Sequence, residues 1–320
     1  MALSDLKVFS QYIKETTIET VAQEIDKFNA ASGGGIILSA NGFDGDFLQE
    51  SMFASLHTAQ RRVDRYATNT AQGTTAVSEI QQNSVKVAGG FGPILWEPAQ
   101  FEWMRANEAA AIEAISRNLS EAIMKDQLNT GIAAAVAALG NVAGLTNDVS
   151  GGAKITYGAI NGAHAKFGDR SSSIIVDIID GVTYHKLIGD NLTNTERLYQ
   201  AQGIQIISIL GKATVVTDAP ALLVAGTPNK RKVLSLVNGG IVISDGSSLI
   251  TNIDQLNGKQ RIETTMQADY DFGVGIKGFA WDTANGGKSP TDAEIATGTN
   301  WDQYATSIKD VAGVVTIGDE

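Results

Sequence analysis

The sequence predicts an α+β fold, and three observations support this class. Residues 99–139 form an alanine-rich run with the spacing of one long helix. Residues 57–97 before it are polar, spotted with glycine and unable to bury a core of their own. After the helix, short apolar runs alternate with helical segments, as in a sheet covered by helices. The junction between the polar stretch and the long helix suggests a protein built for assembly.

Composition limits the class of protein. The chain has 320 residues with 43% hydrophobic content, which suffices for one large domain or two modest ones. It has no cysteine, so disulfides, thiolate metal sites and thiol redox chemistry are excluded. The chain does not begin with a basic segment followed by an apolar one, and no apolar run reaches about eighteen residues. We therefore expect a protein that stays in the cytoplasm and enters no membrane.

The charge balance bears on nucleic acid. The chain has 35 acidic and 24 basic residues, a formal net charge of -11, so as a whole it repels phosphate backbones. Tight binding of DNA is not expected. A weakly repulsive negative charge suits the wall of a container in which nucleic acid must slide. It equally suits an ordinary soluble protein.

The N-terminal part predicts a helix, a strand and a turn. Ser4 can cap a helix over residues 5–29, which has a discontinuous apolar stripe and ends at Gly33-Gly34-Gly35. Residues 36–38 read as a short strand, and residues 42–47 as a turn.

Residues 57–97 predict an extended two-stranded arm. Arg61, Arg62 and Arg65 stand at its base, and strand-like alternation appears at residues 85–87. A lone hairpin is marginal in water, so we expect the arm to rest on a neighbouring chain. The alternative is a disordered surface loop.

Residues 99–139 predict one long helix. Pro98 suits its start and Gly140-Asn141 its end, while Gly131 is a place where it can kink or split. Unbroken, it would be about 60 Å long, which exceeds what an average globular domain needs.

The remaining residues predict a mixed α/β region. Residues 146–154 read as a polar connection, residues 181–192 as a short helix, and Thr291 with Glu294 as a capping box. The predicted strands are residues 173–179, 204–210, 213–217, 233–237, 241–243 and 311–317.

No catalytic, cofactor-binding or metal-ligating residue is predicted, so the chain is not expected to be an enzyme. Gly287-Lys288-Ser289 lacks the first glycine of a phosphate loop, and no nucleophile elbow surrounds residues 171–173. Asp44 and Asp46 lack the other ligands of a calcium loop. The histidines, which lack metal-ligand spacing, are His57, His164 and His185.

The order of these segments resembles the HK97-type major capsid proteins of tailed bacteriophages, over nearly the whole chain. Residues 163–169, 174–177 and 184–187 match that family's helix, strand and following helix. The strand-turn-strand and C-terminal segments that also match are Gly203-Ile204, Gly211-Lys212, residues 215–218 and residues 290–301.

The resemblance implies a five-part division of the chain. The parts are an N-terminal arm and helix with the start of the P domain (1–57), an extended E-loop hairpin (58–97), the P domain with its spine helix (98–169), a mixed α/β A domain (about 170–285) and a return to the P domain (286–320).

The resemblance also implies a function. It is that of a major capsid protein, which assembles in the host cytoplasm as hexamers and pentamers into an icosahedral virion shell around double-stranded DNA. A separate scaffolding protein, a portal and a decoration protein are the implied partners, and the N-terminal helix is a candidate to move when the shell expands. The alternatives are another polymeric virion or surface-layer protein, such as a tail-tube subunit, and an ordinary α/β enzyme.

Overall fold

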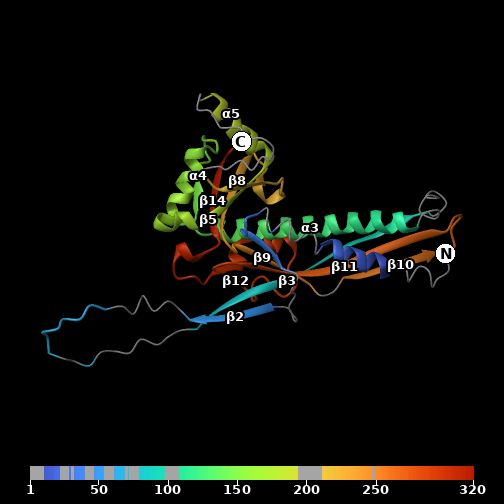
Figure 1. The fold of residues 1–320 in the computed structure, drawn as a ribbon, viewed down its shortest axis with the longest axis horizontal. Coiled ribbons are helices and arrows are strands. Elements are labelled where there is room, and N and C mark those ends of the chain that lie inside the picture. The colour runs from blue at the N-terminus through green and yellow to red at the C-terminus, as the bar shows by residue number, and fades with distance from the viewer. Residues whose placement is uncertain are drawn as a thin grey trace.

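The computed structural model describes residues 11–21, 29, 32–39, 47–53, 61–68, 71, 79–97, 108–193, 211–246 and 249–320. In this part of the chain, two six-stranded sheets share one continuous hydrophobic core, and a long helix lies along one of them (Figure 1). The molecule is elongated, with residues 61–68 at one end of its longest dimension.

The first sheet runs along the elongated part of the molecule. Its strands are β1 (Ile36–Ser39), β2 (Phe47–Phe53), β3 (Glu79–Trp96), β9 (Ile241–Asp245), β10 (Ile250–Leu256) and β11 (Glu263–Ile276). Their order is β1-β9-β11-β3-β2, with β10 also beside β11. The β1–β9 pair is parallel and the other pairs are antiparallel. The strand predicted at residues 36–38 is confirmed as β1.

The predicted two-stranded arm is confirmed at its base, with a shift along the sequence. The first half of β3 pairs with β2, from Phe53 opposite Glu79 to Phe47 opposite Val85, and the second half pairs with β11. The first strand of the hairpin therefore precedes the predicted start at residue 57 and includes Phe47, which was assigned to a turn. Its sequence, FLQESMF, lacks the apolar alternation that marks a half-buried strand.

The central strand β11 was not predicted at all. It pairs with β3 on one side and with β10 and then β9 on the other. A clear signal was present, because every second residue is apolar and buried: Met266, Ala268, Tyr270, Phe272, Val274 and Ile276.

The long helix is confirmed as α3 (Glu108–Gly140), whose 33 residues span about 50 Å at 1.5 Å per residue. The predicted start near Pro98 lies outside the described residues, and the end at Gly140 agrees. The helix continues through Gly131 without interruption. A Cβ at Gly131 would stand 2.8 Å from Cδ1 of Ile243, so this glycine lets α3 approach β9 closely and does not break the helix.

An N-terminal helix packs on α3. Residues 11–21, within the predicted range 5–29, are helical, and Ile13, Thr17 and Val21 are buried on one face. The hydroxyl of Ser116 on α3 donates to the carbonyl oxygen of Ile13 at 3.3 Å. The hydroxyl of Ser120 lies 2.8 Å from the Ser116 carbonyl oxygen within α3 and 3.3 Å from that of Thr17, so its one hydrogen is shared between them. These side-chain bonds hold the two helices together along one face.

The second sheet and its helices lie at one end of α3 (Figure 1) and are called the second body. The strand order of this sheet is β4-β14-β8-β5-β6, with β7 also beside β8. Its strands are β4 (Thr146–Asp148), β5 (Ile174–Ile179), β6 (Ala213–Val216), β7 (Leu223–Val224), β8 (Lys230–Val237) and β14 (Gly313–Asp319). The associated helices are α4 (Tyr157–His164), the 3-10 segment η2 (Ala165–Ser173) and α5 (Gly181–Thr193).

Most predictions for this region are confirmed, namely β5, β6, β8, β9, β14 and α5. The polar connection predicted at residues 146–154 is wrong at its start, because β4 pairs in parallel with β14. The strand predicted at residues 204–210 lies outside the described residues.

The chain crosses between the two sheets at residues 238–240. The strands on either side, β8 and β9, were predicted as successive strands, and each belongs to a different sheet. Gly239 has a φ of 65°, a left-handed conformation that glycine adopts at no steric cost. The crossing therefore joins the two bodies covalently as well as through the core.

The C-terminal segment closes the junction beside α3. It contains β12 (Phe279–Trp281), α6 (Asp292–Ile295), a 3-10 turn at Gly298–Asn300 and β13 (Trp301–Gln303), followed by a 3-10 turn at Ile308–Asp310. A further 3-10 turn, Pro220–Leu222, precedes β7. The predicted capping box of Thr291 and Glu294 is confirmed at the start of α6. The rings of Trp281 and Trp301 meet edge to face, with centroids 4.9 Å apart.

Candidate assembly surfaces

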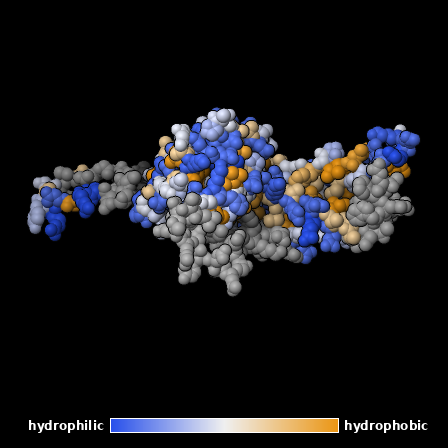
Figure 2. All heavy atoms as spheres, turned by 90° about the horizontal axis from the view of Figure 1, so that it is seen from above, coloured by the Kyte–Doolittle hydropathy of each residue, from blue (hydrophilic) through white to orange (hydrophobic). Residues whose placement is uncertain are grey.

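The arm presents its described tip to solvent. Residues 61–68 are all exposed and lie away from both sheets, at the far end of the molecule in both views (Figures 1 and 2). Tyr66 is 91% exposed and Val63 is 65% exposed. Large apolar side chains this exposed are suited to contact another molecule.

The tip combines cations with an aromatic ring. Arg61, Arg62 and Arg65 are exposed, and the guanidinium of Arg65 lies 5.9 Å from the ring centroid of Tyr66. The Asp64 carboxylate accepts the backbone N–H of Tyr66 at 2.9 Å, which fixes a local turn. The sequence analysis placed these arginines at the base of the arm, whereas the structure places them at its tip.

The elongated part exposes apolar side chains. Figure 2 shows hydrophobic surface over it, and the exposed residues include Ile94 and Leu95 of β3 and Leu256 of β10. A groove of about 340 Å³ lies between β3, β11 and α3. Its apolar lining consists of Phe91, Ile94, Trp96, Ile115, Leu119, Ala122 and Met266. Such surface is typical of protein contacts.

The sheet face opposite α3 is acidic and shallowly hollowed. Tyr270 donates from its hydroxyl to Asp126 of α3 at 2.6 Å, so its ring lies on the helix side. Because side chains alternate along a strand, Asp269 and Asp271 lie on the other face. There they border a hollow of about 450 Å³ with Gly90 and Ile250. Lys86 forms an ion pair with Asp271 at 3.4 Å.

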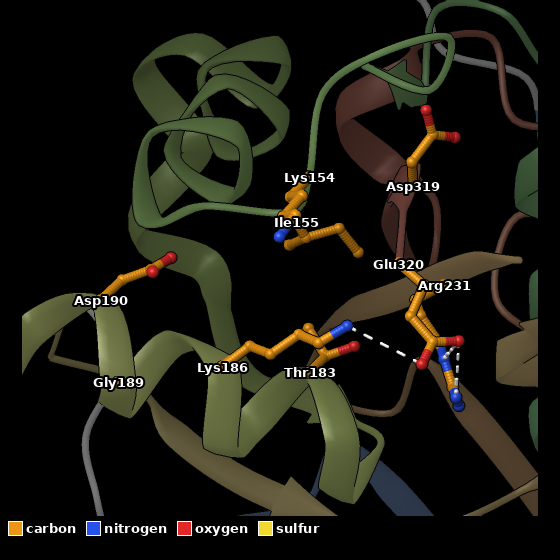
Figure 3. Close-up of a pocket in the computed structure, with 9 residues that line it drawn as sticks. All are labelled: Lys154, Ile155, Thr183, Lys186, Gly189, Asp190, Arg231, Asp319 and Glu320. Carbon is orange, nitrogen blue, oxygen red and sulfur yellow. Dashed lines mark hydrogen bonds and ion pairs between the residues drawn. The ribbon is translucent and has the colours of Figure 1, made fainter. Parts of the chain in front are cut away.

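The second body has a pocket of about 240 Å³ whose charges neutralise one another (Figure 3). Arg231 pairs with Asp180 at 2.9 Å and with Glu320 at 3.0 Å, and Lys186 pairs with Glu320 at 3.7 Å. Hydrogen bonds from Asn229 and Arg231 hold the pKa of Glu320 below its usual value. This network ties β8, α5 and the chain end together and leaves little net charge for a ligand.

The histidines have structural surroundings where the structure describes them. Nε2 of His164 lies 3.1 Å from both Asp177 Oδ1 and Ser235 Oγ. All three are buried, and one ring nitrogen serves both partners, so this cluster cannot relay a proton from serine to aspartate. Sequence reasoning missed the grouping because its members come from α4, β5 and β8. His185 packs edge to face on Tyr184, and His57 lies outside the described residues.

The other sequence motifs show no site chemistry. Residues 171–173 form the end of η2. Gly287, in the segment compared with a phosphate loop, accepts the indole N–H of Trp281 at its carbonyl oxygen at 2.9 Å, which is a structural contact of a turn. Asp44 and Asp46 lie outside the described residues. Within the described ranges, no group of three or more His, Asp or Glu side chains could hold a metal ion. None of the helices described is long and apolar enough to span a bilayer.

Among the carboxyl groups that the structure describes, Asp245 is the one shifted toward its neutral form. It ends β9, beside the point where β11 changes its partner from β10 to β9. Burial, and then the nearby Asp271 carboxylate, raise the pKa of Asp245 to about 6, while the Gly246 N–H opposes the shift. Asp271, the carboxylate that acts on Asp245, is itself paired with Lys86 of β3.

This shift predicts that the fold gains stability as the pH falls. A carboxyl group with a higher pKa in the folded state than in the unfolded state binds protons preferentially when folded. Stability attributable to Asp245 therefore rises as the pH is lowered from above 6 toward its unfolded value of 3.8. We expect the unassembled subunit to melt at a higher temperature at pH 5 than at pH 7.5.

The variant Asp245→Asn isolates this effect from the titration of the histidines. It should raise the melting temperature at pH 7.5 and show a smaller change between pH 7.5 and 5 than the parent. Asp254→Asn, at an exposed acid of β10, is the matched control and should melt as the parent does. An unchanged pH dependence in Asp245→Asn would contradict the assignment.

Comparison with solved structures gives the fold. The structure is similar to the capsid asymmetric unit of cyanophage Pam1 (TM-score 0.54, 13% identity, 89% of this chain and 88% of that chain). It is also similar to the head structure of Helicobacter pylori bacteriophage KHP40 (TM-score 0.51, 11% identity, 89% of this chain and 88% of that chain). A third similar structure is that of Mycobacterium phage Cain (TM-score 0.51, 14% identity, 88% of this chain and 88% of that chain). At these identities the likeness shows the fold, which is the α+β capsid fold of the HK97 type.

The family follows from the sequence itself. The model of the Gp13-like family, described as major capsid protein 13-like, matches residues 5–315. The chain belongs to this family of major capsid proteins. A search of curated protein sequences finds no match.

Family and fold together define the role. The protein is a capsid shell subunit of the virion, with a structural role, and it associates with copies of itself. The resemblance to HK97-type capsid proteins is confirmed, and the tail-tube or surface-layer alternative is not favoured.

Proposed function

We propose that this subunit assembles as hexamers and pentamers into a closed icosahedral shell around phage double-stranded DNA. The observation that carries the proposal is the arm, whose tip projects from a body that is otherwise packed on its own cores. A projecting segment of this kind reaches a neighbouring subunit, and symmetric closure makes many modest contacts cooperative. The net charge of -11 suits a wall that does not bind DNA tightly.

The division of the chain into working parts is also proposed. The E-loop at 58–97, the P domain at 98–169 and 286–320, the A domain at about 170–285 and the N-terminal arm at 1–57 remain predictions. The strand order supports two adjustments. The arm begins with β2, because β2 pairs with β3. Strands β9 to β11 go with the P domain, because β9 approaches α3 at Gly131 and β11 bonds to it through Tyr270 and Asp126.

The partners and place of assembly are inferred from the same family. A separate scaffolding protein, a portal and a decoration protein are expected, with assembly in the host cytoplasm. No enzymatic step is assigned to the chain. The helix predicted at residues 5–29, of which residues 11–21 and 29 are described, is the candidate for movement during expansion, because its one apolar face, with Ile13 and Val21 buried, can dock on a partner element and leave it as a unit.

Electron microscopy of the purified chain, expressed alone and with its scaffolding protein, tests the proposal. Closed shells or curved sheets with local five-fold and six-fold symmetry are expected. Tubes or flat lattices would contradict the shell, and small discrete oligomers under every condition would contradict assembly into a polymer.

A further inference from the structure

The arm tip and the body have opposite charge. Residues 61–68 carry three arginines and one aspartate, whereas the chain as a whole has a net charge of -11. Every residue of this segment is exposed, so the positive charge and the Tyr66 ring are available to a partner. The described tip is therefore one half of a charge-complementary contact.

A receiving surface of suitable chemistry lies on the sheet face opposite α3. Gly90 and Ile250 border its hollow, and Asp269 and Asp271 provide the negative charge. Gly90 gives the hollow a flat floor, since a Cβ there would stand 2.9 Å from Oδ1 of Asp269. An open floor with an apolar rim suits an aromatic ring, and adjacent carboxylates suit a guanidinium.

Asp269 is the more accessible of the two carboxylates. Its side chain accepts the neutral Gln267 amide at 3.0 and 3.3 Å. Among the described residues no cation pairs with Asp269, whereas Asp271 is paired with Lys86. An incoming arginine would therefore meet a carboxylate whose charge is not yet compensated.

We propose that the arm tip of one subunit docks on this face of a second copy, with Tyr66 over the Gly90 hollow and a tip arginine paired with Asp269. The inference rests on the proposed function and names the contact that the arm makes.

The shape of the molecule favours a second copy over DNA as the partner. The tip lies at the end of the longest dimension and stays within the thickness of the body when the molecule is seen from above (Figures 1 and 2). In a shell one subunit thick, a segment that extends along the plate reaches a neighbour before it reaches the interior. The receiving face also belongs to the sheet from which the hairpin extends, because β3 takes part in both.

Charge exchange between the two surfaces tests the contact. The tip variant Arg61→Glu/Arg62→Glu/Arg65→Glu and the face variant Asp269→Arg should each lower the yield of closed particles by about tenfold or more, since one weakened contact repeats around the shell. Combining them should restore the yield to within about threefold of the parent. Asp302→Arg, at an exposed acid of β13, is the matched control and should assemble normally.

An uncharged variant and a folding check complete the test. Gly90→Leu should fill the hollow and lower the yield without changing any charge. Circular dichroism and melting of the unassembled subunits should match the parent in the charge variants, because the positions changed are exposed. Gly90→Leu also displaces the Asp269 side chain, since a Cβ there would stand 2.9 Å from its Oδ1, so its melting temperature is compared with the parent separately.

Three outcomes would overturn the inference. Normal particle yields from both the tip variant and the face variant would overturn the docking contact. The proposed function would still stand if removing the arm prevents assembly. Failure of the combined variant to recover any yield would show that the two surfaces do not meet. Normal empty shells that fail only to retain DNA would identify the tip as a DNA contact.

Discussion

Replacing residues 54–78 with Asn-Gly is expected to give a folded subunit that forms no closed particles. Phe53 and Glu79 are the last pair of the β2–β3 ladder, so a two-residue Asn-Gly turn can join them in the type I′ geometry that hairpins favour. The described residues of this segment, 61–68 and 71, are exposed and belong to neither hydrophobic cluster. The subunit should therefore keep its melting temperature and its far-ultraviolet circular dichroism spectrum.

Sedimentation velocity and electron microscopy measure the loss of particles. A control that exchanges only residues 61–68 for a Gly-Ser stretch of equal length keeps the reach of the arm and removes the chemistry of its tip. If both variants fail, the tip is the essential part. Closed shells at the parental yield from the Asn-Gly variant would remove the arm from the assembly mechanism.

Trp301→Ala is expected to destabilise the subunit more than any surface change. Trp301 is 2% exposed, packs edge to face on Trp281, and donates its indole N–H to the Ile295 carbonyl oxygen at 3.0 Å. Truncating a buried tryptophan leaves a cavity and costs about 3–5 kcal/mol of unfolding free energy. The Ile295 carbonyl group would also lose its donor.

Urea unfolding of the unassembled subunit, followed by circular dichroism, measures this cost. Trp301→Phe is the matched control, because it keeps a ring in the site and loses the donor and part of the volume. Trp301→Phe should lose less unfolding free energy than Trp301→Ala. Equal midpoints for the parent and Trp301→Ala would show that the two-tryptophan contact is not needed for the fold.

Local patterns predicted the elements that depend on local physics. The periodicity of α3, the apolar runs of β5 and β14, and the capping box at Thr291 all rest on neighbours close in sequence. The structure agrees with each of them. Gly131 was misread as a helix breaker because its reason for being small, the approach of Ile243, lies far away in the sequence.

Sheet membership could not be predicted in the same way. Residues 233–237 and 241–243 read as neighbouring strands, yet the crossing at residues 238–240 sends them into different sheets. β2 has no alternation to reveal it, and only its pairing with β3 defines it. These choices are decided by tertiary contacts, which a single sequence does not display.

The candidate surfaces were predicted in part. The arm and its need for a partner followed from a polar stretch without a core, and the arginines were noticed but placed at the wrong end. The acidic hollow was not foreseen, because it depends on the register that sets Gly90 opposite Asp269. The cluster of His164, Asp177 and Ser235 likewise forms only when three elements meet.

The continuity of β3 has a mechanical consequence. One strand of 18 residues bonds to β2 in its first half and to β11 in its second half. Tension applied to the arm therefore runs along the strand axis into β11, perpendicular to the interstrand hydrogen bonds, and loads them in shear. Bonds loaded in this way must fail together instead of unzipping one by one, so we expect this strand to resist a pull that a neighbouring subunit exerts on the arm.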